Sequence, residues 1–467
     1  MAESLTPAPG GTLTEQAARY WAHVRYEDLP PAMVALARRF LLDTLAAGIA
    51  GAGAEPVQAV MRAMSTALQD SGGTSVLWGQ ASRLPPVGAA LVNGTAAHAL
   101  ELDDFGGCGH SGAVVIPAAM ALAGRGGISG RDLLVAILAG YDLAARVLDG
   151  AGGYRPVNRR GWHSTGTCGS FGAAAAAARL LGLKEEPFAD ALGIAGSFTG
   201  GIWAFLVDGA MTKRLHPGKA SETGLTATLL AASGMTGPRH VLEAEWGGFY
   251  GTYTPGIATP EATLAGLGER FGIAASGMKP YACCRSIHAC IDALFALMRD
   301  AEIDSDGIAG MLVHGDAQTR LQFDRQHIAS LLDAQFSLPY TLAVAAESGC
   351  ATIDQFQPLR TREPEIARLM AATQVLADRE LGPTEYPPLE LRLRDGRTAE
   401  RQIAFAKGAP QNPLTDGELR QKVESLIVPA LGAERCRAIV AAVEGLDGLP
   451  DCRTLLDLLA GRDREGT

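Results

Sequence analysis

Apolar residues recur every three to four positions through most of the first 270 residues, which is the spacing of helices that pack against a core. Glycine and proline interrupt this pattern and divide it into separate helices. Ser129, followed by the first-turn acid Asp132, marks one helix start. The helices predicted in this part cover residues 14–24, 32–49, 56–68, 87–102, 131–148, 168–181, 186–196, 221–232 and 239–245.

The pattern changes near residue 266. Short runs of apolar residues predict strands at 308–314, 389–394 and 398–405, and Asp395-Gly396 joins the last two as a hairpin. Helices are expected at 286–298 and 364–370, and the tail from 415 to 459 returns to helical spacing. We therefore expect a mainly α protein, with a large all-helical domain built from both chain ends (1–265 and 410–467) and a smaller inserted α+β lid domain (266–409).

The composition of the chain limits the classes of partner that we expect it to bind. Lys and Arg number 40 against 50 acidic residues, a formal charge of −10, which disfavours nucleic acid or an anionic membrane as the main partner. The most apolar stretch, 191–207, is slightly short for a membrane span and is interpreted as a buried helix. The N-terminus lacks the pattern of a signal peptide, and the eight cysteines lack paired zinc spacings, so we expect a cytoplasmic protein.

A first polar cluster ends an apolar helix. Glu101, Asp103 and Asp104 oppose the helix dipole there, so their position needs a reason other than helix stability, and a glycine-rich loop then presents His110. Asp103 or Asp104 would orient His110 for acid–base work. The structural alternative is a solvated turn with one surface histidine.

A second cluster opens a helix. His163 is followed by Thr165 and Thr167, and the free N–H groups of a helix start are a favourable seat for a carboxylate. Ordinary capping of the helix by a hydroxyl group is the alternative interpretation.

Two further clusters are cationic. Lys213, Arg214 and His216 precede the helix expected at 221, where they would hold a polyanion unless they form a solvated face. A later segment carries Lys279, the adjacent cysteines 283 and 284, Arg285 and His288 at the change of domain. The adjacent cysteines are interpreted as packing residues, and the three basic side chains would face a cleft between the domains.

These segments, in this order, resemble the MmgE/PrpD family, which contains 2-methylcitrate dehydratases, cis-aconitate decarboxylases and an iminodisuccinate epimerase. The resemblance runs from about residue 93 to 340. It is carried by Leu102-Asp103-Asp104 with His110, His163-Ser-Thr-Gly-Thr-Cys-Gly169, Lys213-Arg214-Leu-His216, Lys279-Pro-Tyr-Ala-Cys-Cys-Arg285 with His288, and Gln335-Phe-Ser-Leu-Pro-Tyr340.

The resemblance implies an active site between the two domains, a homodimer, and no required metal or cofactor. Carried over by position, the catalytic candidates are Asp104, His110, His163, Lys213, His288 and Tyr340. The substrate-binding candidates are Thr165, Thr167, Arg214, His216, Lys279 and Arg285. Where many members have Asp-Asp-Thr and then a loop containing His-Pro, this chain has the glycine-rich loop 105–109, which puts the identity of the substrate in question.

The expected activity is that of a lyase that abstracts a proton next to a carboxylate of a small di- or tricarboxylic acid, with dehydration of a 2-methylcitrate or citrate type ranked first. His163 and His110 would share the acid–base work, in either order, with Asp104 setting the charge or tautomer of a neighbouring histidine. Lys213 would bind carboxylates and stabilise the enolate-like charge. His288 and Tyr340 would supply a second acid. The alternatives are decarboxylation of a cis-aconitate type, epimerisation of an iminodisuccinate-like acid, and a non-catalytic anion-binding scaffold.

Overall fold

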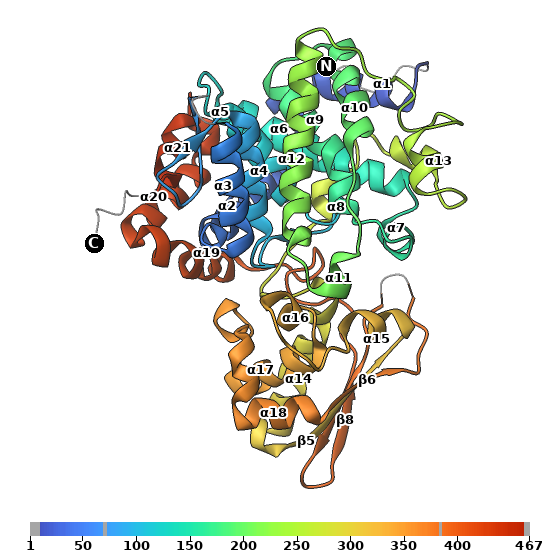
Figure 1. Ribbon diagram of the computed structural model, residues 1–467, viewed down its shortest axis with the longest axis vertical. Helices are drawn as coiled ribbons and strands as arrows, with labels where there is room; N and C mark the ends of the chain where they lie inside the picture. The colour runs from blue at the N-terminus through green and yellow to red at the C-terminus, as the bar shows by residue number, and fades with distance from the viewer. Residues whose placement is uncertain (1–9, 69–71, 383–384, 462–467) are drawn as a thin grey trace.

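The computed structural model describes residues 10–68, 72–382 and 385–461, and it consists of a large helical body above a smaller part that contains a sheet (Figure 1). The prediction of a mainly α fold is confirmed. The helices of the body are α1 (Leu13–His23), α2 (Pro31–Gly51), α3 (Glu55–Ala67), α4 (Pro86–His98), α5 (Gly112–Ala123), α6 (Gly130–Gly150), α7 (Tyr154–Arg159), α8 (Ser164–Thr167), α9 (Gly169–Leu180), α10 (Glu185–Phe198), α11 (Phe205–Asp208), α12 (Thr212–Ala232) and α13 (Phe249–Tyr253).

Small residues bring the central helices of the body close together. All six alanines of 173–178, in α9, are fully buried. A Cβ atom added at Gly140 of α6 would stand 2.4 Å from Val115 and 2.9 Å from the carbonyl oxygen of Gly172 in α9. Backbones at this separation leave no room for larger residues, so the Ala- and Gly-rich composition is a packing requirement of this core.

The lower part is built on one four-stranded sheet with the order β6-β5-β7-β8. β5 (Ile308–Gly315) runs parallel to β6 (Thr373–Ala377) and antiparallel to β7 (Leu389–Leu393), which pairs with β8 (Thr398–Arg401). The helices of this part are α14 (His288–Ala301), α15 (Ala317–Phe323), α16 (Leu331–Gln335), α17 (Leu338–Ser348) and α18 (Pro364–Ala371). Two-stranded pairings occur at β1 (Ser75–Val76) with β2 (Arg83–Leu84) and at β3 (Asp104–Phe105) with β4 (Gly277–Met278).

The chain returns to the helical body after the sheet. The C-terminal helices α19 (Asp416–Leu431), α20 (Ala433–Glu444) and α21 (Arg453–Leu459), red in Figure 1, lie beside the blue N-terminal helices. Lys422 of α19 fixes this contact, because its ammonium group lies 2.5 Å from buried Asp43 and donates to the carbonyl oxygen of Leu102 at 2.6 Å. The domain boundaries near 265 and 410 stay predictions.

Several element boundaries differ from those expected. α12 begins at Thr212 and contains Pro217, which sequence inspection took as a break before a helix starting at 221. α5 was not predicted, because it is buried on every side and so shows no amphipathic period. The helix expected at 239–245 is wrong, since this segment forms turns, and β6 was missed. Ser129 caps α6 as expected, accepting from the N–H of Asp132 at 3.2 Å.

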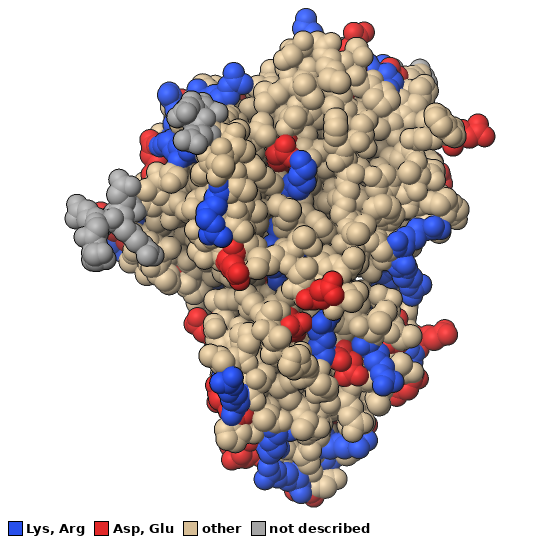
Figure 2. All heavy atoms as spheres, in the orientation of Figure 1, with Lys and Arg blue, Asp and Glu red and all other residues tan. Residues whose placement is uncertain are grey.

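Within the apolar stretch 191–207, α10 ends at Phe198 and the short helix α11 begins at Phe205, so the interpretation of one continuous buried helix is wrong. Within the described ranges, no helix combines the length and the apolar character needed to cross a membrane. On the face drawn in Figure 2, Lys and Arg are interspersed with Asp and Glu.

Candidate active site

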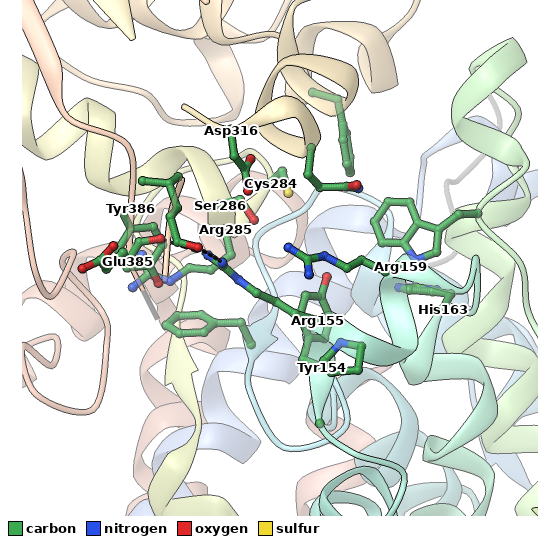
Figure 3. Close-up of a pocket in the computed structure, with 18 of the residues that line it drawn as sticks. Tyr154, Arg155, Arg159, His163, Cys284, Arg285, Ser286, Asp316, Glu385 and Tyr386 are labelled. Carbon is green, nitrogen blue, oxygen red and sulfur yellow. Dashed lines mark hydrogen bonds between the residues drawn. The ribbon is translucent and has the colours of Figure 1, made fainter. Parts of the chain in front are cut away.

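A cavity of about 1390 Å³ lies between the helical body and the sheet-containing part. The body contributes His110, His163 and Lys213, and the other part contributes Arg285 and Asp316. Figure 3 shows Arg155 and Arg159 of α7 extending toward the segments that carry Arg285, Ser286 and Asp316. Four of the twelve residues expected from the sequence therefore line the cavity: His110, His163, Lys213 and Arg285.

The pairing of β3 with β4 brings two of the polar clusters together. Asp104 lies opposite Met278 and Phe105 lies opposite Gly277, so the chain that follows β4 passes beside the loop that follows α4. Lys279 is thereby placed 2.6 Å from Glu101 and 3.5 Å from Asp103, although 176 residues or more separate them in sequence.

Glu101 is the anion at the centre of the site. Its side chain is buried and forms ion pairs with Lys213, Arg214 and Lys279. Burial opposes ionisation, but the charges of Lys213, Lys279 and Arg214 together outweigh it and hold the pKa of Glu101 well below its usual value. Its φ of 56° lies in the left-handed region, which is costly for a non-glycine residue and is tolerated where the surroundings fix the conformation.

Asp103 is the second buried anion, and its carboxylate contacts two histidines. Its Oδ2 lies 2.8 Å from Nδ1 of His98 and 3.1 Å from Nδ1 of His110. Burial raises the pKa of Asp103, but His98, His110 and Lys279 outweigh this effect and lower it well below its usual value. Asp103 therefore accepts hydrogen bonds as a carboxylate from both rings.

The contacts of His110 determine where its proton lies. Nδ1 of His110 is 2.8 Å from the carbonyl oxygen of Asp104 and 3.1 Å from the carboxylate of Asp103, and both of these groups only accept. Nδ1 therefore carries the hydrogen, and Nε2 keeps its lone pair for a ligand in the cavity. Burial, which outweighs the attraction of Asp103, lowers the pKa of His110 and keeps the ring neutral at pH 7.

His163 precedes the short helix α8 and contacts a second ring. Its Nδ1 lies 2.9 Å from Nδ1 of His216 on α12, so one of these nitrogens donates and the other accepts. Burial lowers the pKa of His163 well below its usual value and that of His216 to about 4, with the charge of Lys213 adding to both effects. Trp203 meets the ring of His163 edge-on, with centroids 5.5 Å apart.

Lys213 lines the cavity from the first turn of α12. Its ammonium group contacts Glu101 and Nε2 of His98, the latter at 2.9 Å, and lies 5.2 Å from the ring centre of Phe336. Burial lowers the pKa of Lys213 to about 8, although Glu101 opposes this effect. Lys213 is thus a cation at neutral pH that can release a proton more readily than an ordinary lysine.

Three of the catalytic candidates are held away from the cavity. The carboxyl group of Asp104 accepts from the N–H of Gly112 at 3.0 Å and from the hydroxyl of Tyr141 at 2.9 Å. His288 is buried, with Nε2 3.2 Å from the carbonyl oxygen of Cys283. The hydroxyl of Tyr340 lies 2.8 Å from two backbone carbonyl oxygens, those of residues 355 and 357.

The remaining substrate-binding candidates surround the cavity residues. Lys279 and Arg214 reach Glu101, and Arg214 also donates to the side chain of Gln335 at 2.6 Å. Thr165 and Thr167 are buried in α8. The hydroxyl of Thr165 abuts Gly109, where an added Cβ atom would stand only 2.5 Å away, so the loop that carries His110 requires glycine at this position, whose φ is +125°.

Sequence inspection missed His98. It named Glu101 and Asp103 in the first polar cluster, with Asp103 as one of two acids that could orient His110, but carried neither into the set of site residues. His98 is the last residue of an apolar helix and resembles a core histidine. The usable signal was the polar spacing 98, 101, 103 within an otherwise apolar stretch. Arg155 and Arg159 were also missed, because α7 carries no motif.

Three imidazoles, those of His98, His110 and His163, approach closely enough to share a cation. However, His98 uses Nδ1 toward Asp103 and Nε2 toward Lys213, which leaves it no free lone pair. The neighbouring ammonium group would also repel a metal ion. This donor set therefore fits an acid–base cluster better than a metal centre.

A second group of potential metal ligands, formed by His314, Glu390 and Glu400, lies on the sheet. Glu390 pairs with Arg392 at 2.6 Å and Glu400 pairs with Arg379 at 3.0 Å. The arginines already compensate the charge of both acids.

Comparison with known proteins identifies the family of the chain. A model of the MmgE/PrpD N-terminal domain matches residues 15–260, and a model of the MmgE/PrpD C-terminal domain matches residues 281–447. The cis-aconitate decarboxylase-like protein oryM of Aspergillus oryzae is 28% identical, over 97% of this chain and 98% of its own. The cis-aconitate decarboxylase of Homo sapiens is 28% identical over 96% and 95%, and that of Aspergillus terreus is 28% identical over 94% of each chain.

The resemblance inferred from the polar segments is confirmed, and both parts of the chain carry domains of the same family. We conclude that this protein is a lyase that belongs to the MmgE/PrpD family.

Proposed function

We propose that the protein decarboxylates a small unsaturated tricarboxylate of the cis-aconitate type. The observation that carries the proposal is the charge balance of the buried site. Within the described part of the chain, the cations Lys213, Lys279 and Arg214 contact two carboxylates, those of Glu101 and Asp103. One positive charge remains in excess beside neutral imidazoles, which favours a polyanion. The relatives described above, which are cis-aconitate decarboxylases or a protein similar to them, support this activity over dehydration.

The reaction requires one proton and no oxidant. The bond between the methylene carbon and its carboxyl group breaks, carbon dioxide leaves, and the electron pair of that bond forms a new double bond. The former double bond then supplies an electron pair to the carbon beside a remaining carboxylate, which takes up a proton. The protein must therefore stabilise an enolate-like anion and deliver a proton to carbon.

Lys213 suits both tasks. This residue lines the cavity, and a pKa of about 8 makes its ammonium group charged at pH 7 yet a stronger acid than an ordinary lysine. We assign proton delivery to Lys213. His163 and the free Nε2 of His110 would contact the carboxylates or the reacting carbon from the other side of the site. Asp103, rather than Asp104, would orient His110.

One observation favours a second candidate, dehydration of a citrate-type acid. His110 lines the cavity and its Nε2 is unprotonated, as a base that abstracts a proton α to a carboxylate requires. The same groups would then work in the opposite order, with His110 removing a proton and Lys213 protonating the departing hydroxyl.

A substrate panel in deuterated water separates these reactions. Purified protein is incubated with cis-aconitate, citrate, 2-methylcitrate or iminodisuccinate, with and without chelator, and the products are followed by NMR. The proposal predicts carbon dioxide release from cis-aconitate, with one deuterium on the carbon beside a carboxylate. Alkene formation from citrate or 2-methylcitrate without carbon dioxide would favour dehydration, and label without either product would favour epimerisation. Lys213→Arg keeps a cation and is the matched control for proton delivery.

A further inference from the structure

A chain of buried hydrogen bonds leads from Asp103 through His98 to Lys213. Nδ1 of His98 lies 2.8 Å from Oδ2 of Asp103, and Nε2 lies 2.9 Å from Nζ of Lys213. All three side chains are at most 2% exposed. His98 is not among the residues that line the cavity, so it acts only through its neighbours.

The chemistry of the two end groups fixes the tautomer of His98. The carboxylate of Asp103 accepts, so Nδ1 of His98 donates to it; Nε2 then has a lone pair and accepts from the ammonium group of Lys213. Burial, opposed by Asp103, lowers the pKa of His98 well below its usual value, so the ring stays in this neutral form. A protonated His98 would present an N–H to Lys213 and repel it.

The arrangement accounts for the three N–H groups of the ammonium. One is directed to Nε2 of His98 and one to Oε1 of Glu101. The third has no partner among the described residues, and Lys213 lines the cavity. Glu101 alone would not fix this direction, because its carboxylate is shared with Arg214 and Lys279.

We propose that His98 is a positioning residue that, oriented by Asp103, holds Lys213 as an ammonium group with one N–H directed into the cavity. The inference deepens the proposed function and rests on it for the catalytic importance of Lys213. The placement of Lys213 by His98 is a separate claim, which can be measured without turnover.

Other charged groups around Lys213 must be considered in any test that varies pH. Glu101 favours its charged form, and Arg214 and Lys279 disfavour it. The titratable groups that face Lys213 from the neighbouring elements are His98, Glu101, His110, His163, Arg214, His216, Lys279 and Cys284. The imidazoles stay neutral at and above pH 7, because burial lowers the pKa of each of them.

Two substitutions at His98 distinguish its hydrogen bond to Asp103 from its hydrogen bond to Lys213. His98→Asn places an amide where Nδ1 stands, keeping the donor for Asp103 and removing the acceptor for Lys213. His98→Gln places its amide oxygen where Nε2 stands, keeping the acceptor for Lys213. Losing an acceptor for a buried ammonium group should move the alkaline limb of kcat/KM about one pH unit lower in the Asn variant. The limb should stay near that of the wild type in the Gln variant.

The readout that needs no activity is an NMR titration of lysines labelled with carbon-13 at Cε. The chain contains only six lysines, and Lys213→Arg identifies the signal of residue 213. The inference predicts that this signal titrates at lower pH in His98→Asn than in the wild type and in His98→Gln. Equal titration in all three proteins would overturn it, even if the rates fall. If the wild type proves inactive on every substrate while the titrations differ as expected, the proposed function fails and the positioning of Lys213 by His98 stands.

Discussion

Asp103 and Asp104 are neighbours in sequence with different surroundings, so the same substitution at each position provides a matched test. Asp103→Asn removes the charge that holds His98 and His110, at 2.8 and 3.1 Å. Asp104→Asn changes a carboxyl group whose contacts are the N–H of Gly112 and the hydroxyl of Tyr141. Burial and the charge of Asp103 raise the pKa of Asp104 well above its usual value, so a neutral amide resembles its native state.

The expected magnitudes follow from these contacts. A hydrogen bond to a charged group contributes about 1.5–3 kcal/mol, so an His110 deprived of the Asp103 carboxylate should lose roughly 10- to 100-fold in kcat/KM. Asp103→Asn should also lower the free energy of unfolding by about 3 kcal/mol, because it leaves Lys279 and its neighbours with less compensating charge. Asp104→Asn keeps acceptor and donor groups in place and should cost only about 1 kcal/mol of stability, with activity changed by a few-fold at most.

The assay is the initial rate of product formation by NMR at several substrate concentrations, with thermal unfolding of each variant measured in parallel. Rates are compared at a temperature where both variants are folded. A large loss of kcat/KM in Asp104→Asn together with a near-normal rate in Asp103→Asn would refute the assignment of Asp103 to His110.

Three further outcomes are expected. The rate should fall as pH rises through about 8, where Lys213 loses its proton, and a pH profile of kcat/KM that stays flat to pH 10 would contradict proton delivery by this residue. Gly109→Ala should reduce both activity and melting temperature, because the new Cβ meets Thr165 at 2.5 Å; Gly127→Ala, also at positive φ but in open space, serves as the control for backbone strain alone. Tyr340→Phe should lower unfolding free energy by about 1 kcal/mol in denaturant titrations and leave kcat/KM within about two-fold, since its hydroxyl contacts only backbone carbonyl groups. A loss of activity above ten-fold in the folded Phe variant would show that Tyr340 does contribute to the active site.

The sequence was most informative where hydrophobic periodicity or a histidine-bearing motif was strong. Helices with one buried stripe, such as α1 and α3, were predicted to within two residues, and the segments carrying His110, His163 and Lys213 meet at one cavity. α5 was missed because a fully buried helix has no polar face to set a period.

Sequence reasoning left the partner of His110 open between Asp103 and Asp104. The two acids are equivalent in the sequence pattern, and only the fold shows that the Asp103 carboxylate lies 3.1 Å from Nδ1 of His110 while that of Asp104 contacts Gly112 and Tyr141. His98 was missed because its role depends on Lys213, 115 residues later in the chain.

The ion pair between Lys279 and Glu101 joins the segment that leads into the sheet-containing part to the loop that follows α4. Either part unfolding alone would leave one of these ions without its counter-charge in a site built to exclude water, a state far costlier than the loss of an exposed pair. Partly folded states are therefore unfavourable, and the two parts, whose buried apolar residues form one continuous cluster, should denature in one cooperative transition. An anion that fills the cavity would raise that transition as a whole, so the melting curve of the entire chain becomes a direct gauge of ligand affinity.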